Sequence, residues 1–478
     1  MSGPMANCAI LLLSVLCAGA VGFCHGAAAA PGYVTVSTAS FTPASTCDGP
    51  DPVSLMRNGT SAVLRLTHRH GPCAPSRTSA LEAPSVADML RADQRRAEYI
   101  LKRVSGSGGQ QPQQLGGSKA SSSAVPANWG YNIGTLNYVV TVSLGTPGVT
   151  QTLEMDTGSD LSWVQCKPCA AASCYNQKDP LFDPAQSSTY AAVPCGGAAC
   201  AALGFYGAGG CGTGTGATTA QCGYVISYGD GSNTTGLYGS DTLTLTPTDS
   251  VPGFFFGCGH AQSGLFTGID GLLGLGRRDL SLVEQTVSTY GGVFSYCLPT
   301  TPATTGYLTL GRPAAPSGFS TTQLLSSPNA PSYYIVMLTG ISVGGQQLSV
   351  PASAFAAGTV VDSGTVITRL PPTAYAALRA AFRSGMASYG YPTAPPTGIL
   401  DTCYDFSGYG SATLPTVALT FSGGLTVTLG ADGILSFGCL AFAPTGGDGG
   451  MSILGNVQQR SFEVRIDASS VGFKPNSC

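Results

Sequence analysis

The stretch Met155-Asp156-Thr157-Gly158-Ser159 returns 206 residues later (362 minus 156) as Val361-Asp362-Ser363-Gly364-Thr365. Each copy follows an apolar, strand-like run, and in each an Asp precedes a hydroxyl residue, a Gly and a second hydroxyl residue. One copy alone is typical of an ordinary turn, because Asp, Gly and Ser are common turn residues. Two copies separated by the length of a domain indicate two similar halves, each with an Asp on a matching turn.

Two Asp side chains on matching turns could face each other across a cleft and share a proton. Like charges at short range cannot both ionise, so Asp156 and Asp362 would hold one proton between them. Such a pair can activate a water as a base and protonate a leaving group as an acid. Gly at each turn permits close backbone approach and turn conformations closed to other residues, and the hydroxyls can donate hydrogen bonds that hold each carboxylate in plane. We therefore predict a catalytic pair, Asp156 and Asp362, supported by Thr157, Gly158, Ser159, Ser363, Gly364 and Thr365.

Further motifs match one known family in order and in spacing. They are Trp163, the run Tyr228-Gly229-Asp230-Gly231-Ser232, and the apolar-Gly segments 269–276 and 453–456. With these motifs, residues from about 135 to 478 resemble the pepsin-type aspartic endopeptidases. Asp160 and the dense cysteines make the chain most similar to the plant nepenthesin-like branch of that family.

This resemblance implies a mostly β, bilobal acid-protease fold, in which two similar β lobes flank a substrate cleft. It implies that Tyr228, Gly229 and Asp230 belong to a flap that closes over an extended substrate, with Trp163 behind the flap tyrosine. From the residues alone, Tyr228 could also be a simple strand tyrosine. The implied activity is hydrolysis of protein or peptide substrates by a monomer, with no cofactor and no metal.

Charge divides the chain into a basic first part and an acidic body. The formal net charge is −3, with 21 Lys+Arg and 24 Asp+Glu. Residues 1–125 hold 10 Lys+Arg and 6 Asp+Glu, net +4, which leaves 11 (21 minus 10) against 18 (24 minus 6), net −7. This division is either drift in surface charge or a propiece held electrostatically on an acidic enzyme. The sequence lacks the strong positive charge of a nucleic-acid binder.

An apolar run at residues 9–18 predicts a signal peptide over residues 1–29. No Lys or Arg precedes this run, so a plastid transit peptide is the alternative. The run is too short to span a membrane as a helix. The C-terminal residues 474–478 lack the hydrophobic tail of a lipid-anchor signal, so no membrane anchor is expected.

The remaining chain divides into a propeptide and two lobes. Residues 85–103 predict an amphipathic basic helix, whose cations either face solvent or nucleic acid, or pair with the cleft carboxylates. Residues 106–126 are rich in Ser, Gly and Gln, which predicts a flexible linker and a cleavage site. The expected parts are a propeptide (30–125), an N-terminal catalytic lobe (126–315) and a C-terminal catalytic lobe (316–478).

Seventeen cysteines indicate an oxidising compartment. Twelve lie from Cys166 onward, which fits six disulfides, although spacing alone cannot decide their connectivity. The Cys166-x-x-Cys169 motif could bind zinc, but the body has one His, His260, so no metal site is predicted. The resemblance implies the pairs Cys166–Cys169, Cys174–Cys258, Cys195–Cys222, Cys200–Cys211, Cys297–Cys478 and Cys403–Cys439.

Sequons at Asn58 and Asn233 predict glycosylation. Together, these features lead us to expect an aspartic endopeptidase made as a zymogen and secreted to the cell exterior or sent to the vacuole. Two alternatives stay open: an inactive pepsin-like protein that binds or inhibits, and a plastid protease associated with DNA. Two intact Asp motifs argue against the first, and the acidic body and signal-like leader argue against the second.

Overall fold

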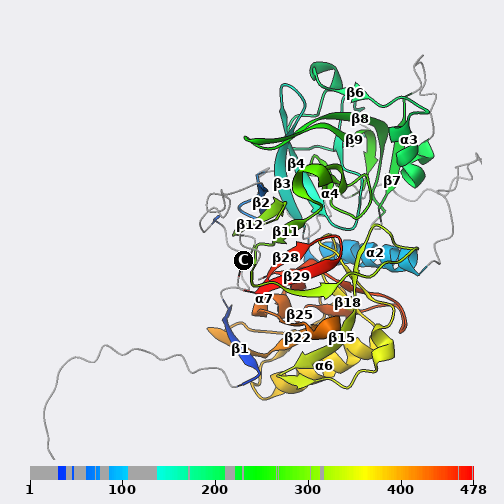
Figure 1. Ribbon diagram of the computed structural model, residues 1–478. Helices are drawn as coiled ribbons and strands as arrows, with labels where there is room; N and C mark the ends of the chain where they lie inside the picture. Colours follow the sequence, from blue (N-terminus) through cyan, green and yellow to red (C-terminus); the bar gives the residue numbers. More distant parts are fainter. Residues whose placement is uncertain are drawn as a thin grey trace, which may run out of the picture.

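The computed structural model describes residues 31–38, 46–47, 61–69, 71–75, 85–105 and 137–478, with gaps at 171–172, 210–220, 229–230, 265, 267, 302, 313–316, 461 and 476. Within these ranges the chain is mostly β-strand and folds into two lobes, which confirms the expected bilobal β architecture (Figure 1). The predicted signal peptide, the linker and the positions Asn58, Cys211, Gly229 and Asp230 lie outside the described residues. Within the described part of the chain, no helix combines the length and the apolar character needed to cross a membrane.

A 14-stranded sheet runs through the N-terminal lobe and into the region between the lobes. Its N-lobe strands are β3 (Tyr138–Leu144), β4 (Val149–Asp156), β5 (Trp163–Gln165), β6 (Ala191–Ala192), β7 (Gly223–Ser227), β8 (Asn233–Thr246), β9 (Asp249–Ser263) and β10 (Gly271–Gly274). The strands toward the other lobe are β2 (Ala62–His68), β11 (Phe294–Cys297), β12 (Thr305–Leu310), β13 (Ser320–Gln323), β28 (Phe462–Ile466) and β29 (Ser470–Pro475). One continuous sheet therefore connects the two halves.

The C-terminal lobe is built from smaller sheets. A five-stranded sheet contains β14 (Tyr334–Val336), β17 (Thr359–Val361), β18 (Thr368–Leu370), β26 (Phe442–Pro444) and β27 (Ser452–Leu454). The other strands are β15 (Leu338–Val343), β16 (Gln346–Gln347), β19 (Thr393–Ala394), β20 (Cys403–Tyr404), β21 (Ser411–Pro415), β22 (Val417–Phe421), β23 (Thr426–Thr428), β24 (Leu435–Ser436) and β25 (Cys439–Leu440). The five-stranded sheet carries the second Asp motif at one edge of the cleft.

Helices are short, with two exceptions, α2 (Val86–Val104) and α6 (Pro372–Ala387). The others are α3 (Ala198–Ala202), α4 (Leu282–Gln285), α5 (Val287–Tyr290), α7 (Ala431–Ile434), α8 (Asn456–Gln459) and the 3₁₀ helices η2 (Pro184–Gln186), η3 (Gly204–Gly209), η4 (Ala352–Phe355) and η5 (Ser422–Gly424). The basic helix predicted over 85–103 is α2, and the side chain of Ser85 caps it by accepting from the backbone N–H of Asp88. Such a cap supplies a partner for a backbone donor that the helix itself leaves unpaired.

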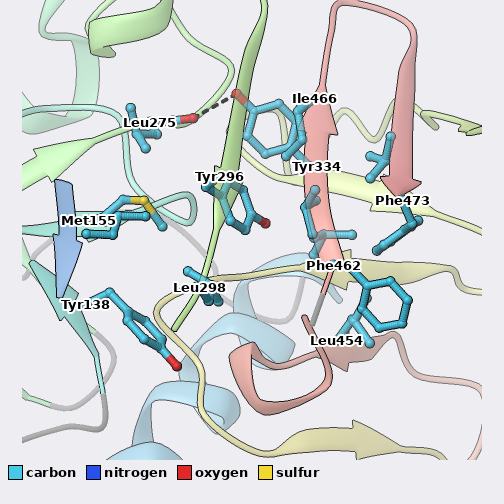
Figure 2. Close-up of a cluster of buried hydrophobic side chains, with 14 of the residues drawn as sticks. Tyr138, Met155, Leu275, Tyr296, Leu298, Tyr334, Leu454, Phe462, Ile466 and Phe473 are labelled. Atoms are coloured by element: carbon cyan, nitrogen blue, oxygen red, sulfur yellow. Dashed lines mark hydrogen bonds between the residues drawn. The ribbon is translucent and has the colours of Figure 1, made fainter. Parts of the chain in front are cut away.

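Large apolar side chains from both lobes meet in one buried cluster (Figure 2). Met155 and Leu275 approach it from the first lobe, and Leu454 and Phe473 from late in the chain. The hydroxyl of Tyr334 donates to the carbonyl of Leu275 at 2.7 Å, so this buried polar group is paired. Because burial of apolar area is the main favourable term in folding, this cluster holds the Asp-bearing strands at a set separation.

Residues from the predicted propeptide are part of the folded structure at three places. Strand β2 lies between β12 and β3 in the large sheet, and β1 (Tyr33–Ser37) pairs antiparallel with β21. Along β2, Ala62, Leu64 and Leu66 are buried and Arg65 is exposed, the alternation of a half-buried strand. Helix α2 lies between the two lobes (Figure 1).

The disulfide pairing differs from the expected one in the N-terminal lobe. Cys297–Cys478 and Cys403–Cys439 form as expected, but the other described bonds are Cys47–Cys73, Cys166–Cys258, Cys169–Cys174 and Cys200–Cys222. The expected Cys166–Cys169, Cys174–Cys258, Cys195–Cys222 and Cys200–Cys211 bonds are therefore wrong.

Strand packing explains these corrections. Strand β5 runs parallel to β9, and the backbone N–H of Cys166, just after β5, donates to the carbonyl of Gly259 at 2.9 Å, so the Cα atoms of Cys166 and Cys258 are 5.3 Å apart. Helix α3 likewise brings Cys200 to 5.7 Å from Cys222 between Cα atoms. Both distances lie in the range that a disulfide spans. Sequence spacing does not reveal such neighbours, because they are set by strand pairing.

Candidate active site

Each Asp of the repeated motif stands at the end of a strand with a parallel neighbour. Asp156 ends β4, which pairs parallel with β10, and Asp362 follows β17, which pairs parallel with β27. The apolar-Gly segments at 269–276 and 453–456 thus lie beside the two motifs, as the resemblance implied. The same local architecture in both lobes brings the two carboxyl groups to one place.

The first hydroxyl of each motif links the two lobes to each other. Thr157 Oγ1 accepts from the backbone N–H of Ser363 at 2.9 Å, and Ser363 Oγ accepts from the backbone N–H of Thr157 at 3.2 Å. The prediction that these two side chains donate to the carboxylates is wrong, because each points into the opposite motif. Their reciprocal bonds instead hold the two Asp-bearing turns in register.

The second hydroxyl of each motif does bind its own carboxylate, as predicted. Ser159 Oγ donates to Asp156 Oδ2 at 2.6 Å, and Thr365 Oγ1 donates to Asp362 Oδ2 at 2.5 Å. The other oxygen of each carboxylate accepts a backbone N–H, from Gly158 at 2.9 Å for Asp156 and from Gly364 at 3.2 Å for Asp362. Both acids are buried, so these bonds set the orientation of each group.

Gly158 and Gly364 are needed because a larger side chain at either position would clash with its neighbours, and not because the backbone there requires glycine. Neither has a positive φ angle, which corrects the expectation that they adopt turns closed to other residues. A Cβ at Gly158 would lie 2.7 Å from Asp362 Oδ1, and one at Gly364 would overlap the guanidinium of Arg96. The absence of a side chain at both positions keeps the space between the carboxylates open.

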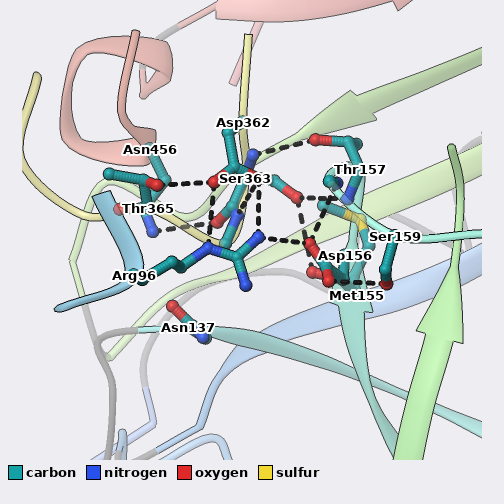
Figure 3. Close-up of polar contacts among 12 residues, drawn as sticks. Arg96, Asn137, Met155, Asp156, Thr157, Ser159, Asp362, Ser363, Thr365 and Asn456 are labelled. Carbon is teal, nitrogen blue, oxygen red and sulfur yellow. Dashed lines mark hydrogen bonds and ion pairs between the residues drawn. The ribbon is translucent and has the colours of Figure 1, made fainter. Parts of the chain in front are cut away.

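Arg96 of α2 occupies that space (Figure 3). Its Nη2 donates to Asp156 Oδ1 at 2.7 Å and to Asp362 Oδ1 at 2.9 Å, and its Nε donates to Asp362 Oδ2 at 2.9 Å. Charge-assisted bonds of this planar fork are among the stronger hydrogen bonds in proteins. With Arg96 in place, a water cannot sit between the two acids.

The ion pairs shift the protonation equilibria in opposite directions. Burial alone would raise the pKa of Asp362, but the charge of Arg96 and the hydrogen bonds from Arg96 and Thr365 lower that pKa overall. Burial alone would lower the pKa of Arg96, but Asp156 and Asp362 raise that pKa well above its ordinary value. Because the pKa of Asp362 is lowered while α2 is bound in the cleft, binding of α2 is most favourable at pH values above the ordinary carboxyl pKa. This binding weakens as the pH falls through the lowered pKa.

Apolar side chains of α2 fill the cleft on the C-lobe side. Met89 and Leu90 join one buried cluster, and Ala97, Ile100 and Val104 join another. On the N-lobe side, the hydroxyl of Tyr99 donates to the carbonyl of Ser227 at 3.2 Å. A cavity of about 30 Å³ remains near Asp156, lined by side chains of α2 and by Tyr228. The helix therefore covers the dyad (Asp156 and Asp362) along both walls.

The predicted flap tyrosine lies directly after β7, at the turn into β8. Its hydroxyl accepts from Trp163 Nε1 at 2.8 Å, and the ring of Phe266 packs against both rings, with centroid distances of 4.8 Å to Trp163 and 5.7 Å to Tyr228. The structure thus places Tyr228 and Trp163 together near the dyad. Phe266 completes this group and had no motif of its own in the sequence.

Two amides lie behind the second motif: Asn456, which the sequence motif 453–456 contained without a stated role, and Gln459, which sequence reasoning missed. Asn456 Nδ2 donates to the carbonyl of Ser363 at 3.0 Å, and Gln459 Nε2 donates to the carbonyl of Asp362 at 3.2 Å. Both belong to α8, which begins at Asn456, the last residue of the segment 453–456. The sequence signal for these two amides was the presence of polar residues directly after an apolar-Gly strand, because the buried carbonyl groups beside such a strand need hydrogen-bond donors.

A second pair of neighbouring carboxyl groups, the buried Asp270 and the half-buried Asp179, lies in the N-terminal lobe. Asp270 Oδ2 accepts from the backbone N–H of Thr152 at 2.5 Å, and Thr152 Oγ1 donates to Asp179 Oδ2 at 2.7 Å. Burial raises the pKa of Asp270, the bond from Thr152 opposes this rise, and the neighbouring Asp179 adds to it. Asp270 therefore keeps its proton at pH values where an exposed Asp would lose it.

This raised pKa predicts that Asp270 contributes stability in acid that is lost as the pH rises toward neutrality. Above an ordinary carboxyl pKa of about 3.9, unfolding of the chain releases the proton of Asp270, so the free energy of unfolding falls by up to about 1.4 kcal/mol per pH unit until the raised pKa is reached. Asp270→Asn keeps an acceptor for Thr152 and cannot ionise, so its stability should fall less over the same range. Urea unfolding from about pH 4 to about pH 7, with Asp362→Asn in every chain so that none processes itself, measures the difference. The exposed Asp279→Asn is the control, and equal pH slopes in all three proteins would contradict the prediction.

Comparisons with known proteins agree with this geometry. Residues 138–312 match the family described as Xylanase inhibitor N-terminal, and residues 333–475 match the one described as Xylanase inhibitor C-terminal. An aspartyl protease family protein of Arabidopsis thaliana is 42% identical over 430 residues, 88% of each chain. Aspartic proteinase nepenthesin-2 of Nepenthes gracilis is 36% identical over 363 residues, 71% of this chain and 78% of that protein. The chain belongs to the plant pepsin-like aspartic protease family.

Solved structures show the same fold at lower identity. Soybean basic 7S globulin has a TM-score of 0.57 at 20% identity, with 71% of this chain and 91% of that chain covered. Conglutin gamma from lupine seeds has a TM-score of 0.56 at 21% identity, with 71% and 91% covered. These likenesses concern the fold alone.

Proposed function

We propose that the chain is an aspartic endopeptidase made as a zymogen, in which α2 blocks the dyad until it is removed. The observation that carries the proposal is the pair Asp156 and Asp362, supported alike from both lobes and bridged by one guanidinium. Such a pair is suited to general acid–base chemistry, since it can hold a single proton between two oxygens. Named aspartic proteases among the relatives support the same class.

Once Arg96 has left, a water can take its place between the carboxylates. The ionised Asp accepts a proton as the water oxygen attacks the peptide carbonyl carbon, and the protonated Asp donates a hydrogen bond to the carbonyl oxygen. The tetrahedral intermediate then breaks its C–N bond, and the amine nitrogen takes a proton from the dyad. General acid–base help of this kind contributes about 10² to 10⁴-fold in rate. Bonds from Ser159 and Thr365 keep both carboxylates oriented throughout.

The zymogen proposal is supported by how the described residues between 31 and 105 contact the body. They supply β1, β2 and α2, and Arg69 forms a buried ion pair with Glu154 at 2.9 Å. We propose residues 30–125 as the propeptide, with cleavage in the linker 106–126, and lobes at 126–315 and 316–478. The basic propeptide and acidic body attract each other, and this attraction weakens as carboxylates protonate in acid.

Secretion or delivery to the vacuole is proposed from the disulfides, which persist in oxidising compartments. Asn233, at the start of β8, is half-buried and its Nδ2 donates to Ser263 Oγ at 2.7 Å, so a glycan there is proposed from the sequon. Tyr228, together with Gly229 and Asp230, is proposed to close over a protein or peptide substrate. A monomer needs no second subunit for this chemistry, because both Asp residues come from one chain.

A pepsin-like binding protein is the second candidate. It is favoured by the family descriptions, which name a xylanase inhibitor. Both Asp motifs are complete in this chain, with every oxygen of the dyad hydrogen-bonded, and this favours a hydrolase over an inactive relative. The two candidates differ in whether an activated chain cleaves peptides.

The test is cleavage of a denatured protein at about pH 4 by the full chain after acid treatment, with and without pepstatin. We expect cleavage that pepstatin abolishes and that disappears near neutrality. No cleavage at any pH, by a chain from which residues before the linker have been removed, would favour the binding protein.

A further inference from the structure

Arg369 of β18 is a buried cation outside the dyad. Its side chain is 1% exposed, and its Nη2 lies 2.9 Å from Asp93 Oδ2 on α2. Within its own lobe, Nη1 donates to the carbonyl of Ile367 at 2.6 Å. Nε has no hydrogen-bond partner in the described part of the chain. The only carboxylate that the described structure pairs with this guanidinium therefore comes from the segment proposed to be removed.

The carboxylate of Asp93 accepts hydrogen bonds from three groups of the C-terminal lobe, which together form a carboxylate-binding site. Besides Arg369, the backbone N–H of Val366 donates to Asp93 Oδ1 at 2.6 Å, and that of Ile367 donates to Asp93 Oδ2 at 3.1 Å. Asp93 is itself 1% exposed. Both oxygens are thus bound by groups of one short segment, which begins four residues after Asp362.

Removal of α2 takes Asp93 out of this carboxylate-binding site. The guanidinium of Arg369 and the N–H groups of Val366 and Ile367 then lack that acceptor. A charge that loses its only counter-ion and stays away from water is strongly disfavoured, and so are backbone donors left without acceptors. Met89 and Leu90 of α2 cover the same wall, packed with Val366 and Ile367, so they would leave with Asp93. A substrate that binds in the cleft after α2 has left therefore contacts one guanidinium and two N–H groups, which point to the place where the Asp93 carboxylate lay.

We propose that Arg369, with the backbone N–H groups of Val366 and Ile367, forms a substrate subsite for an Asp or Glu side chain. This inference rests on the proposed peptidase function and specifies which substrates that function prefers. A guanidinium and two backbone N–H groups bind an anionic carboxylate more strongly than a neutral amide, which offers one acceptor oxygen and turns its NH2 toward the donors. An acidic residue of the substrate would therefore reproduce the contacts of Asp93.

The position of the subsite relative to the cut follows from α2. Asp93 precedes Arg96 by three residues, which is about 4.5 Å along a helix axis. An extended peptide rises about 3.3 Å per residue. We therefore expect the preferred acidic residue within about three positions of the scissile bond.

The test compares matched peptides in which each position near the cut carries Asp, Asn or Ala in turn. The acid-activated chain is expected to cleave the Asp peptide with a kcat/KM about tenfold above that of its Asn twin at one position. In Arg369→Gln this Asp-over-Asn ratio should fall toward one. In Arg369→Lys it should stay intermediate, because Lys keeps the positive charge but lacks the planar guanidinium that bonds both the carboxylate and the carbonyl of Ile367. The ratio is measured within each variant, so a general loss of activity does not enter it.

A second measurement guards against a variant that fails to fold. Synthetic peptides of residues 86–104 are used as inhibitors of the activated wild-type chain, with Asp93→Asn or the exposed Glu98→Gln. We expect Asp93→Asn to raise the inhibition constant about tenfold and Glu98→Gln to leave it unchanged. Equal cleavage of Asp, Asn and Ala peptides at every position, or equal inhibition by all helix peptides, would overturn the subsite while leaving the peptidase function in place. Failure of the wild type to cleave any peptide would instead contradict the proposed function.

Discussion

Arg96→Ala is expected to yield a full-length chain that cleaves peptides at once on acidification, without the delay that removal of α2 imposes on the wild type. Three bonds from Arg96 to the dyad disappear, and each charge-assisted bond is worth about 1.5 to 3 kcal/mol. The two buried carboxylates also lose their counter-ion under the helix, which disfavours the seated state further. We expect α2 to leave the cleft at least about 100-fold more often. The measurement is the initial rate on a quenched peptide immediately after the pH drop.

Arg91→Ala is the matched control on the same helix. The side chain of Arg91 is 66% exposed and pairs with Asp88 of its own helix. It should therefore show the same delay as the wild type. An Arg96→Ala chain with an unchanged delay would mean that the guanidinium between the carboxylates is not what blocks the cleft.

Asp156→Asn and Asp362→Asn are each expected to lower kcat by at least about 10³-fold. Either substitution removes the shared proton, and residues that act as a unit lose most of their effect when one is lost. The Asn oxygen can still accept from the backbone N–H of Gly158 or Gly364, and its amide NH2 can donate to the Ser159 or Thr365 hydroxyl, which can rotate to accept, so the fold should persist. The variants are activated by cleaving their linkers with wild-type enzyme, which is then removed, and are assayed on the same peptide.

The exposed Asp405→Asn tests whether any loss is specific to the dyad, since Asp405 bonds to the backbone N–H of Ser407 on the surface. It should keep wild-type activity. Substantial cleavage by either dyad variant would contradict the two-carboxylate mechanism.

The positions of the two Asp residues were predictable because the local pattern repeats. An apolar strand followed by Asp, hydroxyl and Gly occurs in both halves, and each strand then pairs with an apolar-Gly segment. The hydroxyl directions were not predictable. Thr157 and Ser363 differ from Ser159 and Thr365 only by their place on the turn, yet they bond across the lobes.

The sequence could predict that a cation of the basic helix pairs with the cleft carboxylates, but it could not predict which residue supplies that cation. Several cations lie along α2, and the sequence does not say which one points at the dyad. Asp93 decides this, because its bonds to Val366 and Arg369 set the position of the helix on the C-terminal lobe. The N-lobe disulfides were mispredicted for a related reason: pairing of distant strands, such as β5 with β9, decides which cysteines meet.

Peptidase activity and intact mass, followed together after the full-length chain is shifted from about pH 7 to about pH 4, test the central claim most directly. If α2 blocks the dyad, activity should rise only as the mass falls by the loss of residues up to the linker 106–126, and the Asp362→Asn chain alone should show neither change. Full activity at unchanged mass, with α2 still seated over Asp156 and Asp362, would contradict the account.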